Sequence, residues 1–322
     1  MPIENRSTFK PEDVTLLLTD ITGKIEPKPT EEREKLIQSG VHYSEMLPLE
    51  SRPSERYLTE YYRALDNFSF ETAAAVRQVS GKIYAKKGDD VVLVSLARAG
   101  TPAGILIKRC LKRLFNIAPP HYTISIVRGR GVDMTAMRYI MERHPAENMQ
   151  FVDGWTGKGA ILEELIVASV GFSSEQDRRD LLAVLADPAN ITDMCGTHSD
   201  FPIASSFLNS TVCGLMSRTV IYPGLKDGEF HGVSFYDEFR NEDRTYEFID
   251  RIEKKISGLG DIGANNRQAV VEATVSARPI GLEALARIDT IGLEALARTD
   301  TTGLNALADV DMAETSGITE VH

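Results

Sequence analysis

The chain is poor in cysteine and has no long apolar runs. Its three cysteines, Cys110, Cys195 and Cys213, are odd in number and irregularly spaced, so neither a disulfide framework nor a CxxC zinc pair is expected. Apolar stretches such as VVLVSLA and LIVASV are much shorter than the roughly 18 residues that a membrane-spanning helix needs. The N-terminal segment MPIENRSTFKPEDV does not show the profile of a signal peptide. These absences predict a cytoplasmic protein with no membrane partner.

The sequence also has no surplus of basic residues. It contains 36 Lys and Arg against 47 Asp and Glu, a formal net charge of −11, and its pI is about 5.2. Binding nucleic acid without regard to sequence requires a basic face that neutralises phosphates, so broad nucleic-acid binding is not expected. Apolar residues make up 42% and charged residues 26%, which is the balance of a globular protein with a substantial core.

Alternating apolar strands and amphipathic helices begin near residue 90. The expected strands are DDVVLVSLA, HYTISIV, MQFVDG and DLLAVLADPA, and the expected helices are PAGILIKRCLKRLF, MTAMRYIMERH and GAILEELIVASV. This order predicts an α/β fold, a parallel sheet with helices on both faces. Upstream, LLLTDITGK is typical of a short strand and turn. A short helix capped by Thr30 and ended by Gly40 should follow, and Arg56–Ala85 should be helical with a break near Asn67–Ser69.

The pattern divides the chain into three parts. Residues 1–89 are expected to form an N-terminal hood, a region that covers the substrate. Residues 90–256 should form the α/β core, and residues 257–322 a flexible tail. In the tail, Gly281, Gly292 and Gly303 mark the near-copies IGLEALARIDT, IGLEALARTDT and TGLNALADVDM, with a period of eleven. An uninterrupted repeat of this length can support a right-handed supercoil. Glycine in every copy disfavours a continuous helix, so we expect short helical turns on a tether.

Three loops that follow strands have compositions suited to anion binding, and ligands of parallel sheets bind at these strand ends. The first is Arg98, Ala99 and Gly100, where small residues and an arginine precede a helix. The second, Arg128–Asp133, carries Arg128 and Arg130 between glycines, which could clamp a phosphate. The third loop, at Asp153–Gly159, has neither the GxxxxGK[ST] pattern of a P-loop nor the GxGxxG pattern of a dinucleotide site.

The third loop joins a strand directly to a helix and is the strongest of the three signals. Its residues are Asp153, Gly154, Trp155, Thr156, Gly157, Lys158 and Gly159. A carboxylate at the strand end can accept hydrogen bonds from sugar hydroxyls, and the turn after it can wrap a monophosphate with backbone N–H groups, a hydroxyl and an ammonium. The loop therefore predicts a site for a phosphate and a ribose.

The segment MQFVDGWTGKGAI resembles the phosphoribosyl-pyrophosphate motif of the type I phosphoribosyltransferases, and the likeness extends over roughly residues 90–190. The resemblance implies that Asp153 holds the ribose hydroxyls and that Thr156–Gly159 hold the 5′-phosphate. It also implies a pyrophosphate loop at Arg98–Gly100 and a catalytic loop at Arg128–Asp133. The family usually has two adjacent acidic residues, whereas here Gly154 takes the second place.

A wider set of segments resembles a narrower family. HYSEMLPLE, FVDGWTGKG and DMCGTHSDFPIASSFLNSTVCGL are similar to StiP-type proteins, which are encoded with tellurium-resistance and stress genes. The likeness covers about residues 10–250. Members are labelled either cysteine protease or phosphoribosyltransferase-like, and the resemblance implies a role in making a nucleoside-like metabolite.

The main functional expectation is an enzyme that transfers a phosphoribosyl group from phosphoribosyl pyrophosphate to an unidentified small acceptor. The resemblance implies Mg²⁺, bound mainly through the substrate pyrophosphate, and Arg98, Arg128 and Arg130 would help it to neutralise the leaving group. Arg128, Arg130 and Asp153 are the expected catalytic residues. The segment from His42 to Glu45 could cover the acceptor, and the chain could pair as a homodimer.

Two other readings remain open. A chain without the second acidic residue could bind the phosphoribosyl ligand as a sensor and not turn it over. Alternatively, Cys195 could be the nucleophile of a cysteine protease, with His198 nearby in MCGTHSD. A thiolate needs a base, but the base is normally brought from elsewhere in the fold. Cys110 and Cys213 are expected to be buried packing residues.

Overall fold

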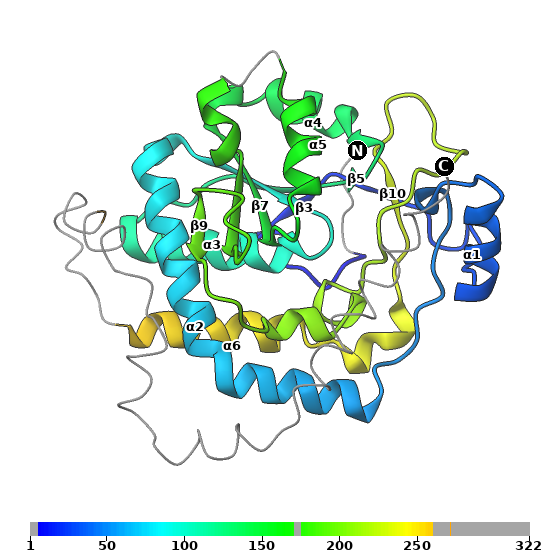
Figure 1. The fold of residues 1–322 in the computed structure, drawn as a ribbon, viewed down its shortest axis with the longest axis horizontal. Coiled ribbons are helices and arrows are strands. Elements are labelled where there is room, and N and C mark those ends of the chain that lie inside the picture. Colours follow the sequence, from blue (N-terminus) through cyan, green and yellow to red (C-terminus); the bar gives the residue numbers. More distant parts are fainter. Residues whose placement is uncertain (1–5, 171–174, 260–270, 272–322) are drawn as a thin grey trace. The chain divides into compact units, whose positions relative to one another are not determined.

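The computed structural model describes residues 6–170, 175–259 and 271. At its centre is a six-stranded sheet with the order β1-β4-β3-β7-β8-β9 (Figure 1). Its strands are β1 (Thr15–Leu16), β3 (Val92–Leu96), β4 (His121–Ile124), β7 (Met149–Trp155), β8 (Leu182–Ala186) and β9 (Cys195–Thr197). Each neighbouring pair is parallel. The expectation of an α/β fold with a parallel sheet is therefore confirmed.

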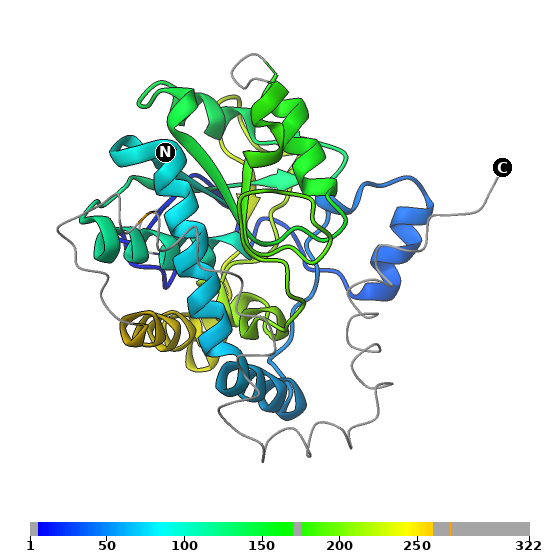
Figure 2. The ribbon, with the colours of Figure 1, turned by 60° about the vertical axis from the view of Figure 1, so that its left-hand side comes forward.

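Helices cover both faces of this sheet (Figures 1 and 2). The helices α2 (Glu55–Lys87), α3 (Gly100–Phe115) and α6 (Thr245–Gly258) share one hydrophobic core with the sheet. The helices α4 (Met134–Met141) and α5 (Ala160–Ala168) share a second core on the opposite face. A strand that is covered on both faces needs apolar residues at successive positions, and this is why β3 reads VLVSL without alternation.

The helix α2 runs from Glu55 to Lys87 without interruption, so the predicted break near Asn67–Ser69 is wrong. The helix packs along α3, α6 and β9, and its buried face extends from Tyr61 to Ile83. Packing of one continuous apolar face stabilises a helix more than the weak local preferences of Asn and Ser oppose it.

The shorter elements lie around this framework. The helix α1 (Thr30–Gln38) begins after Pro29, which takes the N-cap position expected for Thr30. The strands β2 (Thr19–Asp20) and β10 (Gly232–Val233) pair in parallel. The strands β5 (Ile126–Val127) and β6 (Gly131–Val132) form an antiparallel hairpin. The 3-10 helices span Tyr43–Glu45, Gly88–Asp90, Ala146–Asn148, Glu175–Asp180, Ala204–Phe207, Ser210–Val212 and Asp237–Glu242.

In the described part of the chain, every helix is too short or too polar to cross a membrane. The eleven-residue repeats of the expected tail lie outside the described residues. The divisions expected after residues 89 and 256 stay predictions.

Candidate active site

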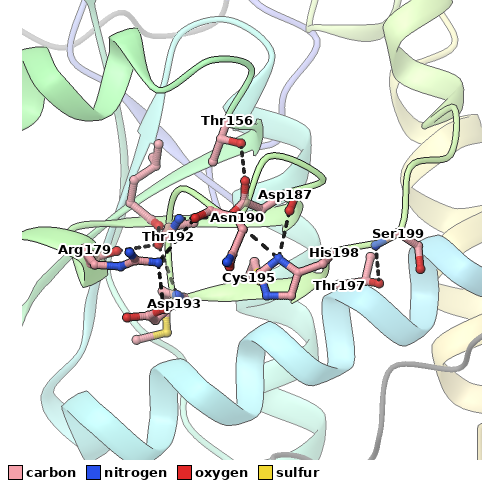
Figure 3. A network of polar contacts seen from close by, with 12 residues as sticks. Thr156, Arg179, Asp187, Asn190, Thr192, Asp193, Cys195, Thr197, His198 and Ser199 are labelled. Carbon is pink, nitrogen blue, oxygen red and sulfur yellow. Dashed lines mark hydrogen bonds and ion pairs between the residues drawn. The ribbon is translucent and has the colours of Figure 1, made fainter.

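The carboxyl ends of three neighbouring strands meet at one edge of the sheet. Ala186, the last residue of β8, is the register partner of both Trp155 in β7 and Thr197 in β9. The residues that follow these three strands directly are Thr156, Asp187 and His198. Because the strands are parallel, the three side chains gather at the edge where such sheets bind ligands (Figure 3).

The thiol of Cys195 lies against the imidazole of His198. The Sγ atom of Cys195 is 3.4 Å from Nε2 and 3.8 Å from Nδ1 of His198. The Nδ1 atom of the same ring is 2.8 Å from the backbone oxygen of Asp187. A carbonyl oxygen can only accept a hydrogen bond, so Nδ1 carries the hydrogen and Nε2 is the unprotonated ring nitrogen. The two similar distances place the sulfur over the face of the ring, nearer to Nε2. This is the tautomer that a general base needs.

The carboxylate of Asp187 is fully buried beside this pair. Its Oδ1 accepts a hydrogen bond from Thr156 Oγ1 at 2.7 Å, and its Oδ2 accepts one from Thr192 N at 2.9 Å. Oδ2 lies 3.9 Å from Nδ1 of His198. A carboxylate in this position stabilises the imidazolium that forms when the base takes a proton. Cys195, His198 and Asp187 therefore bring together the three kinds of group that can serve as a nucleophile, a base and an orienting acid.

The surroundings of Cys195 keep its thiol protonated. The side chain belongs to the core on the α5 side of the sheet, and only 1% of the residue is exposed. Burial raises the pKa of the Cys195 thiol, and the positive charge of Lys82 opposes this only in part. A base must therefore take the proton before the sulfur can attack. The side chain of His198 is 45% exposed, so its imidazole reaches the surface.

Local packing explains how the sequence holds these groups in place. A Cβ atom on Gly196 would clash with the backbone of Ala75, so glycine lets α2 lie directly against β9. The loop before β9 turns at Asn190, which has a left-handed φ of 56°. The hydroxyl of Thr192 donates to the carbonyl of Leu182 at 2.8 Å and accepts from Met194 N at 3.1 Å. The loop from Asp187 to Cys195 is thus fixed at both ends.

The structure places the third predicted loop beside this cluster. Thr156 touches Asp187, and its carbonyl accepts from Gly159 N at 3.1 Å. Gly157 and Gly159 have positive φ angles, and Lys158 is exposed. Asp153 accepts a hydrogen bond from the N–H of the adjacent Gly154 at 2.7 Å, and burial raises its pKa to about 7. Of the predicted ligands, Thr156 is the one that meets the Cys195 cluster.

The other two predicted loops have partners within the protein. The guanidinium of Arg98 forms an ion pair with Glu50 and donates to the carbonyl of Met216 at 3.0 Å. Ala99 is the N-cap residue of α3, and Gly100 is the first residue of the helix. In the β5–β6 hairpin, Arg130 pairs with Glu45 at 3.0 Å, and the backbone N–H of Arg128 donates to the Tyr43 hydroxyl at 2.9 Å. The segment expected to cover an acceptor therefore contacts this hairpin.

Comparison with known proteins identifies the family. A family model described as "Tellurite-like stress resistance cysteine protease StiP" matches residues 7–253. The chain belongs to the StiP family. It is also 36% identical over 256 residues to "Cysteine protease StiP" of Acinetobacter baylyi, an alignment that covers 76% of this chain and 66% of that protein. The chain thus spans slightly less than two thirds of the length of this relative. No solved structure matches the chain.

These matches confirm the wider resemblance and overturn the main functional expectation. Both the StiP family and its curated member are named as cysteine proteases, so the expectation of a phosphoribosyltransferase that binds phosphoribosyl pyrophosphate is wrong. The likeness to the type I phosphoribosyltransferase fold is not confirmed. The hydroxyl of Thr156, expected to bind a phosphate, donates to the carboxylate of Asp187 instead. The Mg²⁺ expectation depended on that substrate's pyrophosphate and is not tested.

Sequence reasoning missed Asp187. The signal was its place directly after the apolar strand LLAVLA, the same position that drew attention to Asp153 after β7. In the sequence, Cys195 and His198 are only three residues apart, whereas the base of a catalytic cysteine normally comes from a distant part of the chain. The sequence alone does not reveal that the end of β9 brings them together beside the end of β8. Cys110 and Cys213 are buried and free, as expected for packing residues.

Proposed function

We propose that this StiP-family chain is a thiol-dependent peptidase. Cys195 is the nucleophile, His198 is the general base, and Asp187 orients His198. The observation that carries the proposal is the contact of 3.4 Å between Cys195 Sγ and His198 Nε2, in a ring whose other nitrogen is held by Asp187. The names of the family and of its relative point to the same chemistry.

The groups suffice for acyl transfer without a cofactor. Nε2 of His198 takes the thiol proton, and the sulfur attacks the carbonyl carbon of a peptide bond. The tetrahedral adduct collapses to a thioester as the leaving amine receives the proton from His198. Water then gives a proton to the same nitrogen and attacks the thioester, which releases the acid and regenerates the thiol. Asp187 stays ionised throughout and stabilises the imidazolium.

The burial of Cys195 sets a condition on this chemistry. Because the residue is only 1% exposed, a substrate carbonyl reaches Sγ only when a neighbouring group moves aside. His198, whose side chain is 45% exposed, is the neighbour with room to do so. The structure then represents the enzyme without substrate, in which His198 still covers the thiol of Cys195. A cytoplasmic location remains part of the proposal, and pairing as a homodimer stays a prediction.

The proposal is tested with the full chain and a dye-labelled unfolded protein as substrate. Cys195→Ala should abolish hydrolysis, and His198→Gln should lower the rate by about 10²–10⁴-fold, the usual contribution of general base catalysis. Cys213→Ala removes another buried thiol and is the matched control, which should keep its activity. Hydrolysis that persists in Cys195→Ala would rule out this thiol as the nucleophile.

A second readout does not depend on the choice of substrate. Iodoacetamide should alkylate Cys195 faster in the wild type than in His198→Gln, because only the wild type has a base to form the thiolate. Mass spectrometry of peptides separates Cys195 from Cys110 and Cys213. Equal rates at Cys195 in both proteins would contradict the role of His198.

A further inference from the structure

The same three residues have the composition of a metal site. Within the residues that the structure describes, Asp187, Cys195 and His198 offer ligand atoms that lie within 4.8 Å of one another. Thiolate, imidazole and carboxylate are the three kinds of ligand that Zn²⁺ takes in proteins. Sulfur and nitrogen ligands at about 2.3 and 2.0 Å from one tetrahedral ion lie about 3.5 Å apart. The Sγ–Nε2 distance of 3.4 Å already has this spacing.

The hydrogen bonds around the cluster orient its ligand atoms as they do in metal sites. A metal-binding histidine usually donates its other ring N–H to a carbonyl or carboxylate, and Nδ1 of His198 lies 2.8 Å from the backbone oxygen of Asp187. The Asp187 carboxylate is in turn held by Thr156 and by the backbone of Thr192. These bonds leave Nε2 without a hydrogen and with Sγ 3.4 Å away.

The site also has a route for an ion to enter. The side chain of His198 is 45% exposed, while Cys195 and Asp187 are buried behind it. Three protein ligands with solvent at the fourth position is a coordination that zinc adopts. The spread of up to 4.8 Å exceeds the spacing around one ion, so binding must draw the groups together by about 1 Å. The exposed His198 ring has the freedom for this shift.

We propose that a thiophilic divalent cation of the zinc class binds to Cys195 Sγ, His198 Nε2 and a carboxylate oxygen of Asp187, and holds the enzyme inactive. When the ion binds, the thiol proton passes to solvent and a bond forms between sulfur and the metal. The lone pair of Nε2 is taken by the same ion, so neither the nucleophile nor the base is available. A chelator removes the ion and a proton returns to the sulfur. The inhibitory part rests on the proposed function, but the binding part does not.

Binding is measured on the full chain with Co²⁺ as a spectroscopic probe and Zn²⁺ as its competitor. The expected result is one Co²⁺ per chain, with sulfur-to-cobalt charge-transfer absorption that Zn²⁺ displaces. Cys195→Ala should lose this absorption, and His198→Gln should weaken binding at least tenfold. The matched controls Cys110→Ala and Cys213→Ala should bind as the wild type does. Circular dichroism of each variant verifies that it is folded.

Absence of the charge-transfer absorption in the wild type, or its persistence in Cys195→Ala, would overturn the metal site. In the hydrolysis assay, one equivalent of Zn²⁺ should suppress activity and excess EDTA should restore it. If Zn²⁺ binds through Cys195 while hydrolysis continues, the inhibitory role is wrong. If the metal-free chain hydrolyses nothing but still binds Co²⁺ through Cys195, the proposed peptidase fails and the metal site stands.

Discussion

Replacing Thr156 by valine tests whether the end of β7 supports the cluster around Cys195. The hydroxyl of Thr156 lies 2.7 Å from Oδ1 of Asp187, a carboxylate with no exposed surface. Valine keeps the shape of the side chain but leaves this oxygen without the hydroxyl. A hydrogen bond to a charged group contributes about 1.5–3 kcal/mol, and a distance this short places the bond among the stronger ones. For a domain of about 250 residues, each kcal/mol lowers Tm by roughly 2–4 °C. We therefore expect Tm to fall by about 3–12 °C.

The assay is thermal unfolding followed by circular dichroism at neutral pH, with the rate of hydrolysis measured below the transition. A less firmly held Asp187 should also lower that rate, by about tenfold for each 1.4 kcal/mol of lost transition-state stabilisation. Thr156→Ser keeps the hydroxyl and serves as the matched control, which should recover most of both losses. If Thr156→Val unfolds within about 0.5 kcal/mol of the wild type and hydrolyses as fast, the link between Thr156 and Asp187 does not support the site.

Three further predictions concern the framework. Gly196→Ala should destabilise the fold by about 1–3 kcal/mol in urea titrations because the new Cβ clashes with the backbone of α2, whereas Gly154→Ala, where a Cβ has open space, should not. Burial lowers the pKa of His121 to about 3; the unfolded chain therefore binds the proton first, and stability should fall as the pH drops from about 6.5 towards 3, by about 2 kcal/mol at pH 5. His121→Gln should remove this dependence in denaturant titrations, and an unchanged slope would contradict a buried neutral imidazole. Glu50→Gln leaves the guanidinium of Arg98, 11% exposed, without its ion pair, so calorimetry should record a loss of about 3–5 kcal/mol.

The sequence by itself determined the elements of the core. Apolar runs at β3, β7 and β8, each followed by an amphipathic helix or a loop, predicted a parallel sheet covered on both faces, because backbone groups and apolar side chains leave few other arrangements. The prediction of a helix break from local residue preferences was wrong because tertiary packing outweighs those preferences. The helix α2 continues through Asn67–Ser69 because its buried face packs against α3, α6 and β9.

The identity of the site was decided by tertiary structure. From the sequence, Thr156 resembled a phosphate ligand and Cys195 an ordinary loop cysteine, since each was interpreted only with its near neighbours. The register of β7, β8 and β9 sets Thr156, Asp187 and His198 next to one another, although 31 residues separate the first two. The pairing of strands depends on contacts between residues far apart in the sequence. A sequence motif therefore shows which side chains are present, and only the packed strands show which of them hydrogen-bond to one another.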